Sequence, residues 1–391
     1  MDPLKAEALA AIDAERGTLV DLADRLHAEP EIGFQEQRSS ASLVDFLCRH
    51  GFTVEYPVGG LPTAFRARRG TGSPNIALIA EYDALPEIGH GCGHNLIAMS
   101  AMGAAVGVAA VLGKLNGTLW VIGTPAEERL FEWPGKVQLL KAGVFDGIDA
   151  AIMFHPWGGG VSAVVSHDRA LITLDVTFHG RPAHAAADPW NGANALNGVT
   201  LALTAIDFLR QQLKPEVRIH YQVTHGGDVP NIIHARAAAR IQVRAEDQNY
   251  LTESVVPQVE NCIRGAALAT GTHADIERVS PIDGTICNPV LAQVITEAAG
   301  ELGISLGEPV VMGGSTDFGN VSRALPAAYF LLDIGVEKGV AWHSREVAEA
   351  AAKPAAHRAG LDAARILALS AIELMRRPAL LVDAWDAHPK A

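Results

Sequence analysis

A short glycine-rich loop carries residue types that can bind a divalent metal ion. Asp83, Cys92 and His94 lie in DALPEIGHGCGHN, directly after the apolar run NIALIAEY. A thiolate and an imidazole separated by one residue are good ligands for a borderline-soft ion such as zinc. A simpler interpretation also fits these residues, in which Cys92 is a small buried side chain and His94 caps the following helix.

Two further apolar runs end in residues that could bind metal or move protons. Glu127 and Glu128 follow TLWVIG, and His155 follows AAIMF. One of two adjacent carboxylates can bind a metal while the other transfers protons to and from a reacting water. Such a pair also commonly caps a helix N-terminus, and a lone histidine of this kind is more often a core residue with satisfied hydrogen bonds.

His343, in AWHSREV, is the last candidate ligand, and by itself it is typical of a surface loop near a helix cap. The four polar segments together supply one cysteine, three histidines and one or two glutamates. These candidate ligands are more than the four that one tetrahedral metal site takes. They fit two metal ions that share ligands and activate a water molecule.

A second group of candidates lies apart from the ligand set: His184 in GRPAHAA, Asn231 in VPNII, Arg244 on an alternating strand, and Ser315 and Thr316 in GGSTDFGNVS. A guanidinium that faces a cleft would bind a substrate carboxylate, whereas on the surface it would only be a strand residue. The loop with Ser315 and Thr316 is typical of a substrate contact or of a helix N-cap. It is not a phosphate loop, because no lysine follows it.

The order of elements predicts how these loops come together. NIALIAEY, TLWVIG and AAIMF are continuous apolar runs that alternate with helices, which indicates an α/β domain with a mainly parallel sheet. Ligands of such sheets bind beyond the carboxyl ends of the strands, where all three polar loops lie. We expect helices at 4–27, 36–51, 96–113, 288–302 and 345–376, and a further strand at AAYFLLDIG.

Residues 169–283 have a different character. ALITLDVTFHG, VRIHYQVTHGG, ARAAARIQVRA and HADIERVS read as strands, with helices at 191–213 and 250–269. This β-α-β-β-α-β order predicts a ferredoxin-like α+β domain inserted into the first one. The expected domains are therefore 1–168 with 284–391, and 169–283. The tail from Arg377 has no assignment.

Composition narrows the class of protein. The 391 residues are 49% hydrophobic and carry a net charge of −13, which disfavours binding to nucleic acids or anionic membranes. Four cysteines are too few for a disulfide scaffold. Residues 1–28 read as an amphipathic helix and not as a leader, and the apolar stretch 96–112 as a core helix. We expect a cytoplasmic protein.

The motifs, in their order along the chain, identify a resemblance. AEYDALPEIGHGCGHN, GTPAEE, FHP, GRPAHAA, VPNII, GGSTDFGNVS and WHS are similar to those of the aminoacylase/glutamate-carboxypeptidase superfamily of co-catalytic metallohydrolases. The similarity is to its amidohydrolase branch, which includes aminobenzoyl-glutamate hydrolase subunits, indole-acetyl-amino-acid hydrolases and β-alanyl dipeptidases. Many members read C-G-H-D, whereas this chain has Asn95, which favours the aminobenzoyl-glutamate and β-alanyl groups.

The resemblance implies two divalent ions per chain, zinc or manganese, with cobalt or nickel able to replace them in vitro. It implies a homodimer formed through the inserted lid domain. Glu127 would be the general base, Asp83 would orient a ligand imidazole, and His184 would stabilise the oxyanion, in its own chain or across the dimer. Asn231 and Arg244 would contact the substrate. The implied metal ligands are Cys92, which would bridge the ions, His94, Glu128, His155 and His343.

The expected reaction is hydrolysis of the amide bond of an N-acyl amino acid or small dipeptide to a carboxylic acid and an amino acid. A dipeptidase of the β-alanyl type, or a non-catalytic subunit of a hetero-oligomeric hydrolase, is the alternative. The same metals could also cleave an ester or a carbamoyl group. The sequence does not name the acyl group, the amino acid or the native metal.

Overall fold

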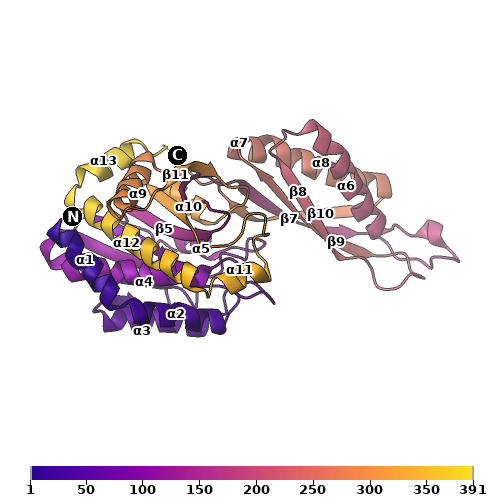
Figure 1. The fold of residues 1–391 in the computed structure, drawn as a ribbon. Helices are drawn as coiled ribbons and strands as arrows, with labels where there is room; N and C mark the ends of the chain where they lie inside the picture. Colours follow the sequence, from indigo (N-terminus) through magenta and orange to yellow (C-terminus); the bar gives the residue numbers. More distant parts are fainter. Residues whose placement is uncertain (1, 390–391) are drawn as a thin grey trace.

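The computed structural model describes residues 2–389 and contains two β-sheets with their helices (Figure 1). The larger sheet has eight strands in the order β1-β2-β4-β3-β5-β12-β6-β11. β3 pairs in parallel with β4 and β5, β5 with β12 and β6 with β11, whereas β1 with β2, β2 with β4 and β6 with β12 are antiparallel pairs. The predicted, mainly parallel α/β sheet is confirmed. Its strands are β1 (Thr53–Glu55), β2 (Phe65–Thr71), β3 (Asn75–Ala80), β4 (Gly117–Gly123), β5 (Ala150–Trp157), β6 (Ala163–His167), β11 (Gly307–Val311) and β12 (Ala327–Asp333).

Helices cover both faces of this sheet, because its central strands are apolar on both sides. Ile76 and Leu78 of β3 pack into one core cluster, and Ala77 and Ile79 pack into another on the opposite face. The first face carries α1 (Pro3–Ala14), α2 (Arg16–Ala28), α3 (Gln37–Arg49), α4 (His94–Val111), α9 (Pro289–Glu301) and α12 (Pro354–Arg376); the second carries α5 (Gly135–Lys141) and α10 (Phe318–Ala324).

Helix α4 runs through the centre of the larger core. The segment His94–Lys114, which includes the 3-10 turn η1 (Leu112–Lys114), has a mean hydropathy of 2.1 and is long enough to cross a membrane. It is 89% buried inside the protein, against α1, α2 and α12. It is therefore the core helix that the sequence predicted.

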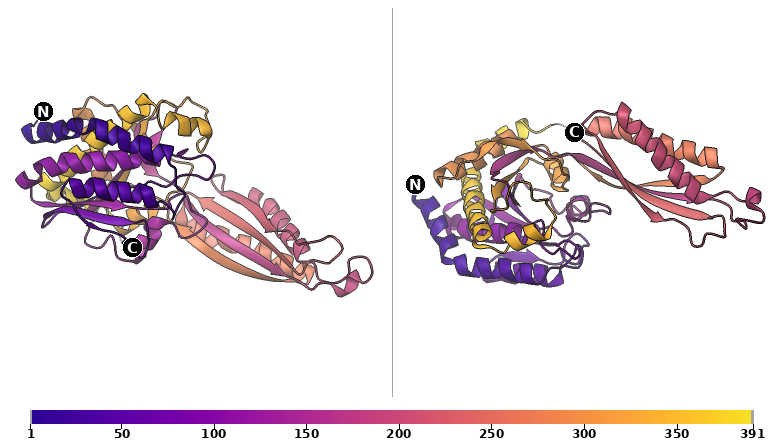
Figure 2. Two further views of the ribbon diagram at one scale, coloured as in Figure 1. Left: turned by 90° about the horizontal axis from the view of Figure 1, so that it is seen from below. Right: turned by 45° about the vertical axis from the view of Figure 1, so that its right-hand side comes forward.

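The second sheet projects away from the larger one, as both views of Figure 2 show. Its strands follow the order β10-β7-β9-β8 and are all antiparallel, and α6 and α8 cover one face, as in the ferredoxin-like arrangement predicted from the sequence. We call residues 169–283 the lid; the domain boundaries themselves stay a prediction. Its elements are β7 (Ala170–His179), η2 (Pro189–Asn191), α6 (Ala195–Leu209), η3 (Arg210–Gln212), β8 (Arg218–His225), β9 (Arg236–Ala245), α7 (Gln248–Tyr250), the π-turn η4 (Leu251–Val255), α8 (Val256–Thr270) and β10 (His273–Ile282).

Some predicted elements differ from the structure. The single helix expected at 4–27 is two helices, because Glu15 leaves the helical conformation with ψ 6°. The helix expected at 345–376 is divided into α11 (Arg345–Ala350) and α12, which starts at Pro354, a residue without the N–H that a continuous helix needs. Strands β6 and β11 were not predicted, and the unassigned tail forms α13 (Ala379–Asp386).

Candidate metal centre

The candidate ligands lie at one edge of the larger sheet, at or just beyond the carboxyl ends of its parallel strands. Asp83 follows β3, Glu127 and Glu128 follow β4, and His155 lies near the end of β5. Cys92 precedes the first turn of α4, in which His94 lies. Gly93 between them has φ 78°, and a Cβ atom there would lie 2.6 Å from Cγ of Pro156, so only glycine fits this turn.

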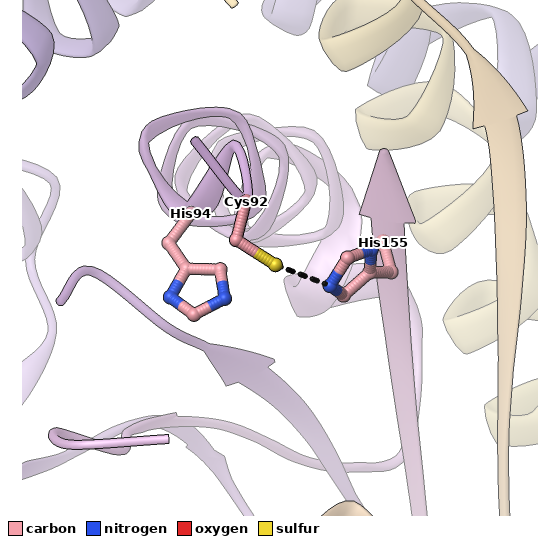
Figure 3. Close-up of side chains that lie close together, drawn as sticks. All are labelled: Cys92, His94 and His155. Atoms are coloured by element: carbon pink, nitrogen blue, oxygen red, sulfur yellow. Dashed lines mark hydrogen bonds between the residues drawn. The ribbon is translucent and has the colours of Figure 1, made fainter. Parts of the chain in front are cut away.

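Two histidines and the cysteine point toward one another (Figure 3). The Sγ atom of Cys92 lies 3.4 Å from Nε2 of His155. Nε2 of His94 lies 3.9 Å from Oε1 of Glu128, and that same oxygen lies 3.3 Å from Nε2 of His343. Ligand atoms lie within 4.8 Å of one another in three overlapping groups: Cys92, His94 and His155; Cys92, Glu128 and His343; and His94, Glu127 and Glu128.

The imidazoles of His94 and His155 are each oriented by a hydrogen bond at the ring nitrogen that faces away from the cluster. Nδ1 of His94 lies 2.9 Å from Oδ1 of Asp83, and Nδ1 of His155 lies 2.8 Å from the carbonyl oxygen of Pro156. Such bonds place the proton on Nδ1 and leave the lone pair of Nε2 for the cluster, as in metal-binding histidines. Burial lowers the pKa of His155 to about 4, which keeps this ring neutral at pH 7.

The residues present fit a divalent metal. Nε2 of His94 and Oε1 of Glu128 are buried and have no hydrogen-bond partner among the described residues. Burial raises the pKa of the Cys92 thiol, with the charge of Glu128 adding to it, so a cation is needed to hold the thiolate. Burial works against a charged His94, but the charge of Cys92 as a thiolate and that of Asp83 raise the pKa of His94 well above the usual range. The surroundings of the cluster thus favour positive charge.

Glu127 and Glu128 differ in surroundings although they are neighbours in the chain. Ala126 before them has φ 59°, a strained conformation, and its N–H donates to Oε1 of the buried Glu36 at 2.9 Å. Burial raises the pKa of Glu127 well above the usual carboxyl range, and the charges of Glu81 and Glu128 add to the effect. Burial acts on Glu128 in the same direction, but the neighbouring His343 and His94 outweigh it and lower its pKa.

His343 reaches the cluster from a loop between β12 and α11. It has φ 64°, and its side chain is 47% exposed, far more than the other candidate ligands. Its N–H donates to the carbonyl oxygen of Gly91 at 3.3 Å, which joins its loop to the loop of Cys92. Beside it, the rings of Trp342 and Trp157 lie 4.4 Å apart.

The cluster opens into a cavity of about 440 Å³, a size that suits a small molecule. Arg244, Ser315 and Thr316 line it together with Cys92, Glu127, Glu128, His155 and His343. NH1 of Arg244 donates to Oγ of Ser315 at 3.1 Å, and the buried Nε of Arg244 has no partner among the described residues. A guanidinium with unused donors on the wall of a cavity can bind a carboxylate.

His184 and Asn231 lie elsewhere. The structure places both on the surface of the lid, side by side, and neither lines the cavity. Their loop region is at the end of the lid that is remote from the larger sheet (Figure 1). Nδ1 of His184 accepts hydrogen bonds from the N–H groups of Ala186 and Ala187, at 3.2 and 3.1 Å, which directs Nε2–H outward. Their predicted roles stay predictions.

Sequence reasoning missed several residues of the site. Glu81 is buried two positions before Asp83, and Lys136 and Asp317 are buried beside it. Asp168 lines the cavity and accepts a hydrogen bond from the Tyr329 hydroxyl at 2.8 Å. Glu81 follows β3 directly, so the expectation that ligands bind beyond the carboxyl ends of parallel strands could have indicated it. No local signal marks the lysine.

Comparisons with known proteins agree with this geometry. The model of peptidase family M20/M25/M40 matches residues 77–361. A mouse Xaa-Arg dipeptidase is 36% identical over 405 residues, covering 97% of this chain and 91% of the mouse protein. One subunit of the p-aminobenzoyl-glutamate hydrolase of Escherichia coli K12 is 34% identical over 315 residues, covering 75% of this chain and 64% of the Escherichia coli protein.

Among solved structures, the fold is similar to that of a dinuclear metal binding peptidase of Bacillus subtilis. The TM-score is 0.67 at 20% identity, and the match covers 92% of this chain and 99% of the other.

Proposed function

This chain belongs to peptidase family M20/M25/M40 and is a metallohydrolase of amide bonds, and we propose that it cleaves an N-acyl amino acid or small dipeptide to a carboxylic acid and an amino acid. The observation that carries this proposal is the shared cavity. Its lining contains the thiol, imidazoles and carboxylates and also a guanidinium whose buried Nε has no partner among the described residues. A small substrate with a free carboxylate suits both groups.

Cys92, His94, Glu128, His155 and His343 would hold two divalent ions, zinc or manganese, and Cys92 belongs to two of the three overlapping groups of ligand atoms. When bound, such ions polarise a carbonyl and make water acidic enough to be deprotonated near neutral pH. Glu127 would take the proton of the attacking water and return it to the leaving nitrogen. Burial and the neighbouring acids raise the pKa of Glu127 in the metal-free site, and the positive charge of bound ions would lower it again, so that the carboxylate can accept a proton.

Arg244 would bind the carboxylate of the leaving amino acid, with Ser315 and Thr316 beside it. His184, with Asn231, would serve the site of a partner chain, since both lie outside the cavity of their own chain. A homodimer through the lid is supported by Leu201 and Phe208 of α6, whose side chains are 40% and 74% exposed. A cytoplasmic location is supported by the four free cysteines.

The name of the mouse relative favours the dipeptidase alternative. The name of the Escherichia coli relative favours a role as one subunit of a larger hydrolase. A non-catalytic subunit would have no use for a buried Glu127 beside a complete set of ligand-type residues, so we propose an active enzyme. The leaving amino acid separates the two relatives, because one name specifies arginine and the other glutamate.

The test is a panel of dipeptides and N-acyl amino acids that end in arginine, lysine, glutamate or a C-terminal amide, with product detection and metal analysis. Arg244→Met should raise KM at least tenfold for substrates with a free carboxylate and much less for the amides. Arg236→Met is the matched control, because Arg236 lies on the same strand but is exposed. Protein that holds its metal and cleaves no member of the panel, alone or with a partner subunit, would contradict the proposal.

A further inference from the structure

A buried lysine joins two carboxylates beside the candidate metal centre. Lys136 lies in the first turn of α5 and has no exposed surface. Its Nζ atom lies 2.6 Å from Oε1 of Glu81 and forms a short ion pair with Oδ1 of Asp317. The backbone N–H of Lys136 donates to the other oxygen of Asp317 at 2.9 Å. Burial of three charged groups is costly unless they are paired in this way, so the arrangement calls for an explanation.

The two carboxylates belong to different parts of the site. Oε2 of Glu81 lies 3.5 Å from Nε2 of His94, which connects the lysine to the candidate ligands. Asp317 directly follows the segment 313–316, which lines the cavity, and directly precedes α10. Lys136 therefore lies between the candidate metal cluster and the segment that lines the cavity.

The segment 313–316 is in turn bonded to the first residues and to β9 of the lid. Ser315 accepts the hydrogen bond from Arg244 of β9, and the carbonyl oxygen of Gly314 accepts from the N–H of Arg169 at 3.0 Å. A series of close contacts thus runs from His94 through Glu81 and Lys136 to Asp317, follows the chain from Asp317 to Ser315, and ends in the hydrogen bond between Ser315 and Arg244.

Close backbone packing holds the middle of this series in place. A Cβ atom on Gly135 would lie 1.9 Å from the carbonyl oxygen of Pro125, and one on Gly319 would lie 1.8 Å from that of Asp283. The start of α5 is therefore pressed against the segment that leads to Glu127, and α10 against the chain that returns from the lid. Both helix starts, which carry Lys136 and Asp317, are therefore closely packed against neighbouring backbone.

We propose that Lys136 is a positioning residue, which holds the segment 313–316, and through Ser315 the guanidinium of Arg244, at a set distance from the metal cluster. The proposal rests on the proposed function, because Arg244 is there the group that binds the substrate carboxylate. The competing view is that Lys136 only neutralises buried acids and stabilises the fold.

The first test needs no turnover. We would compare amide hydrogen exchange in wild type, Lys136→Met and Lys141→Met, in the full-length protein. Lys141 is the matched control, because it lies on the same helix but is exposed. In Lys136→Met, peptides covering 311–324 should exchange at least tenfold faster, while those of β5 and α12 stay unchanged. Unchanged exchange in 311–324, or an equal rise throughout the chain, would overturn the proposal.

Kinetics provide the second test. Lys136→Met should raise KM at least tenfold and change kcat less than threefold, with metal content intact, and the loss should largely disappear in an Arg244→Met background. A fall in kcat together with lost metal would show that Lys136 acts on the cluster through Glu81, and would overturn the proposal. If Lys136→Met does not fold, Asp317→Asn must show the same exchange pattern. If no substrate is cleaved, the exchange result still decides the role of Lys136, and the proposed function alone fails.

Discussion

The Nδ1 atom of His94 lies 2.9 Å from Oδ1 of Asp83, and neither side chain has any exposed surface. The second oxygen of Asp83 accepts the backbone N–H of Glu128 at 2.9 Å. One carboxylate thus orients the imidazole of one candidate ligand and the backbone of another, although Glu128 follows a different strand from Asp83 and His94.

Asp83→Asn should weaken metal binding without removing a ligand. The amide group can donate to Nδ1 of His94, which would move the ring proton to Nε2, where the metal needs a lone pair. We expect a loss of about 10–100-fold in metal affinity, the usual effect of removing such a partner. Competition with a chelating dye measures it. Asp146→Asn, at an exposed position, is the control; equal affinities for both variants would contradict the role of Asp83.

Substitutions of the adjacent residues Glu127 and Glu128 should differ in their effects on metal content and on kcat. Glu127→Gln keeps the shape but cannot accept a proton, so it should retain metal and lose about 10²–10⁴-fold in kcat. Glu128→Gln should lose metal as well. Metal analysis and steady-state kinetics on both variants provide the test. If Glu127→Gln has the metal deficit and Glu128→Gln does not, the two roles are reversed.

The exposed His184 provides a test of the dimer. His184→Ala should reduce kcat by about 10²–10³-fold, as loss of one oxyanion donor does, and leave metal content unchanged. If His184 serves the partner chain, mixing His184→Ala chains with Glu127→Gln chains should restore activity, because one site in each mixed dimer carries neither defect. If mass spectrometry shows that mixed dimers form but activity is not restored, His184 does not act across the dimer.

The buried Glu36 should make stability depend on pH. Burial and the charge of Asp83 raise the pKa of Glu36 from 4.5 to about 7. The folded state therefore binds this proton more tightly than the unfolded chain, and this stabilising contribution is lost as the pH rises from 4.5 to about 7. Glu36→Gln cannot lose a proton, so its Tm relative to wild type should increase between pH 5 and pH 8 in metal-free protein. The control is Glu337→Gln at an exposed position, whose Tm should change with pH as that of wild type does. If the Tm of Glu36→Gln also follows wild type, the raised pKa of Glu36 is refuted.

Local sequence determined most of the metal cluster. The apolar runs that became β3, β4 and β5 are buried on both faces, so their ends had to meet at one edge of a parallel sheet, and Cys92, Glu128 and His155 with them. The ferredoxin-like order of the lid was equally visible, because alternation and helical spacing are properties of short segments. The divisions at Glu15 and Pro354 were harder to predict, since each interrupts a helical pattern for only a few residues.

Only the tertiary structure decided which charges are buried and which predicted residues share the cavity. Lys136 lies in GKVQLLK, which reads as an ordinary amphipathic helix, yet its partner Asp317 is 181 residues away along the chain. Arg244 was predicted to contact the substrate and His184 to stabilise the oxyanion, but the path of the lid places the first on the cavity wall and the second on the outer surface. Residue type and spacing specify what a side chain can do, whereas its burial and partners depend on long-range packing, which no short segment encodes.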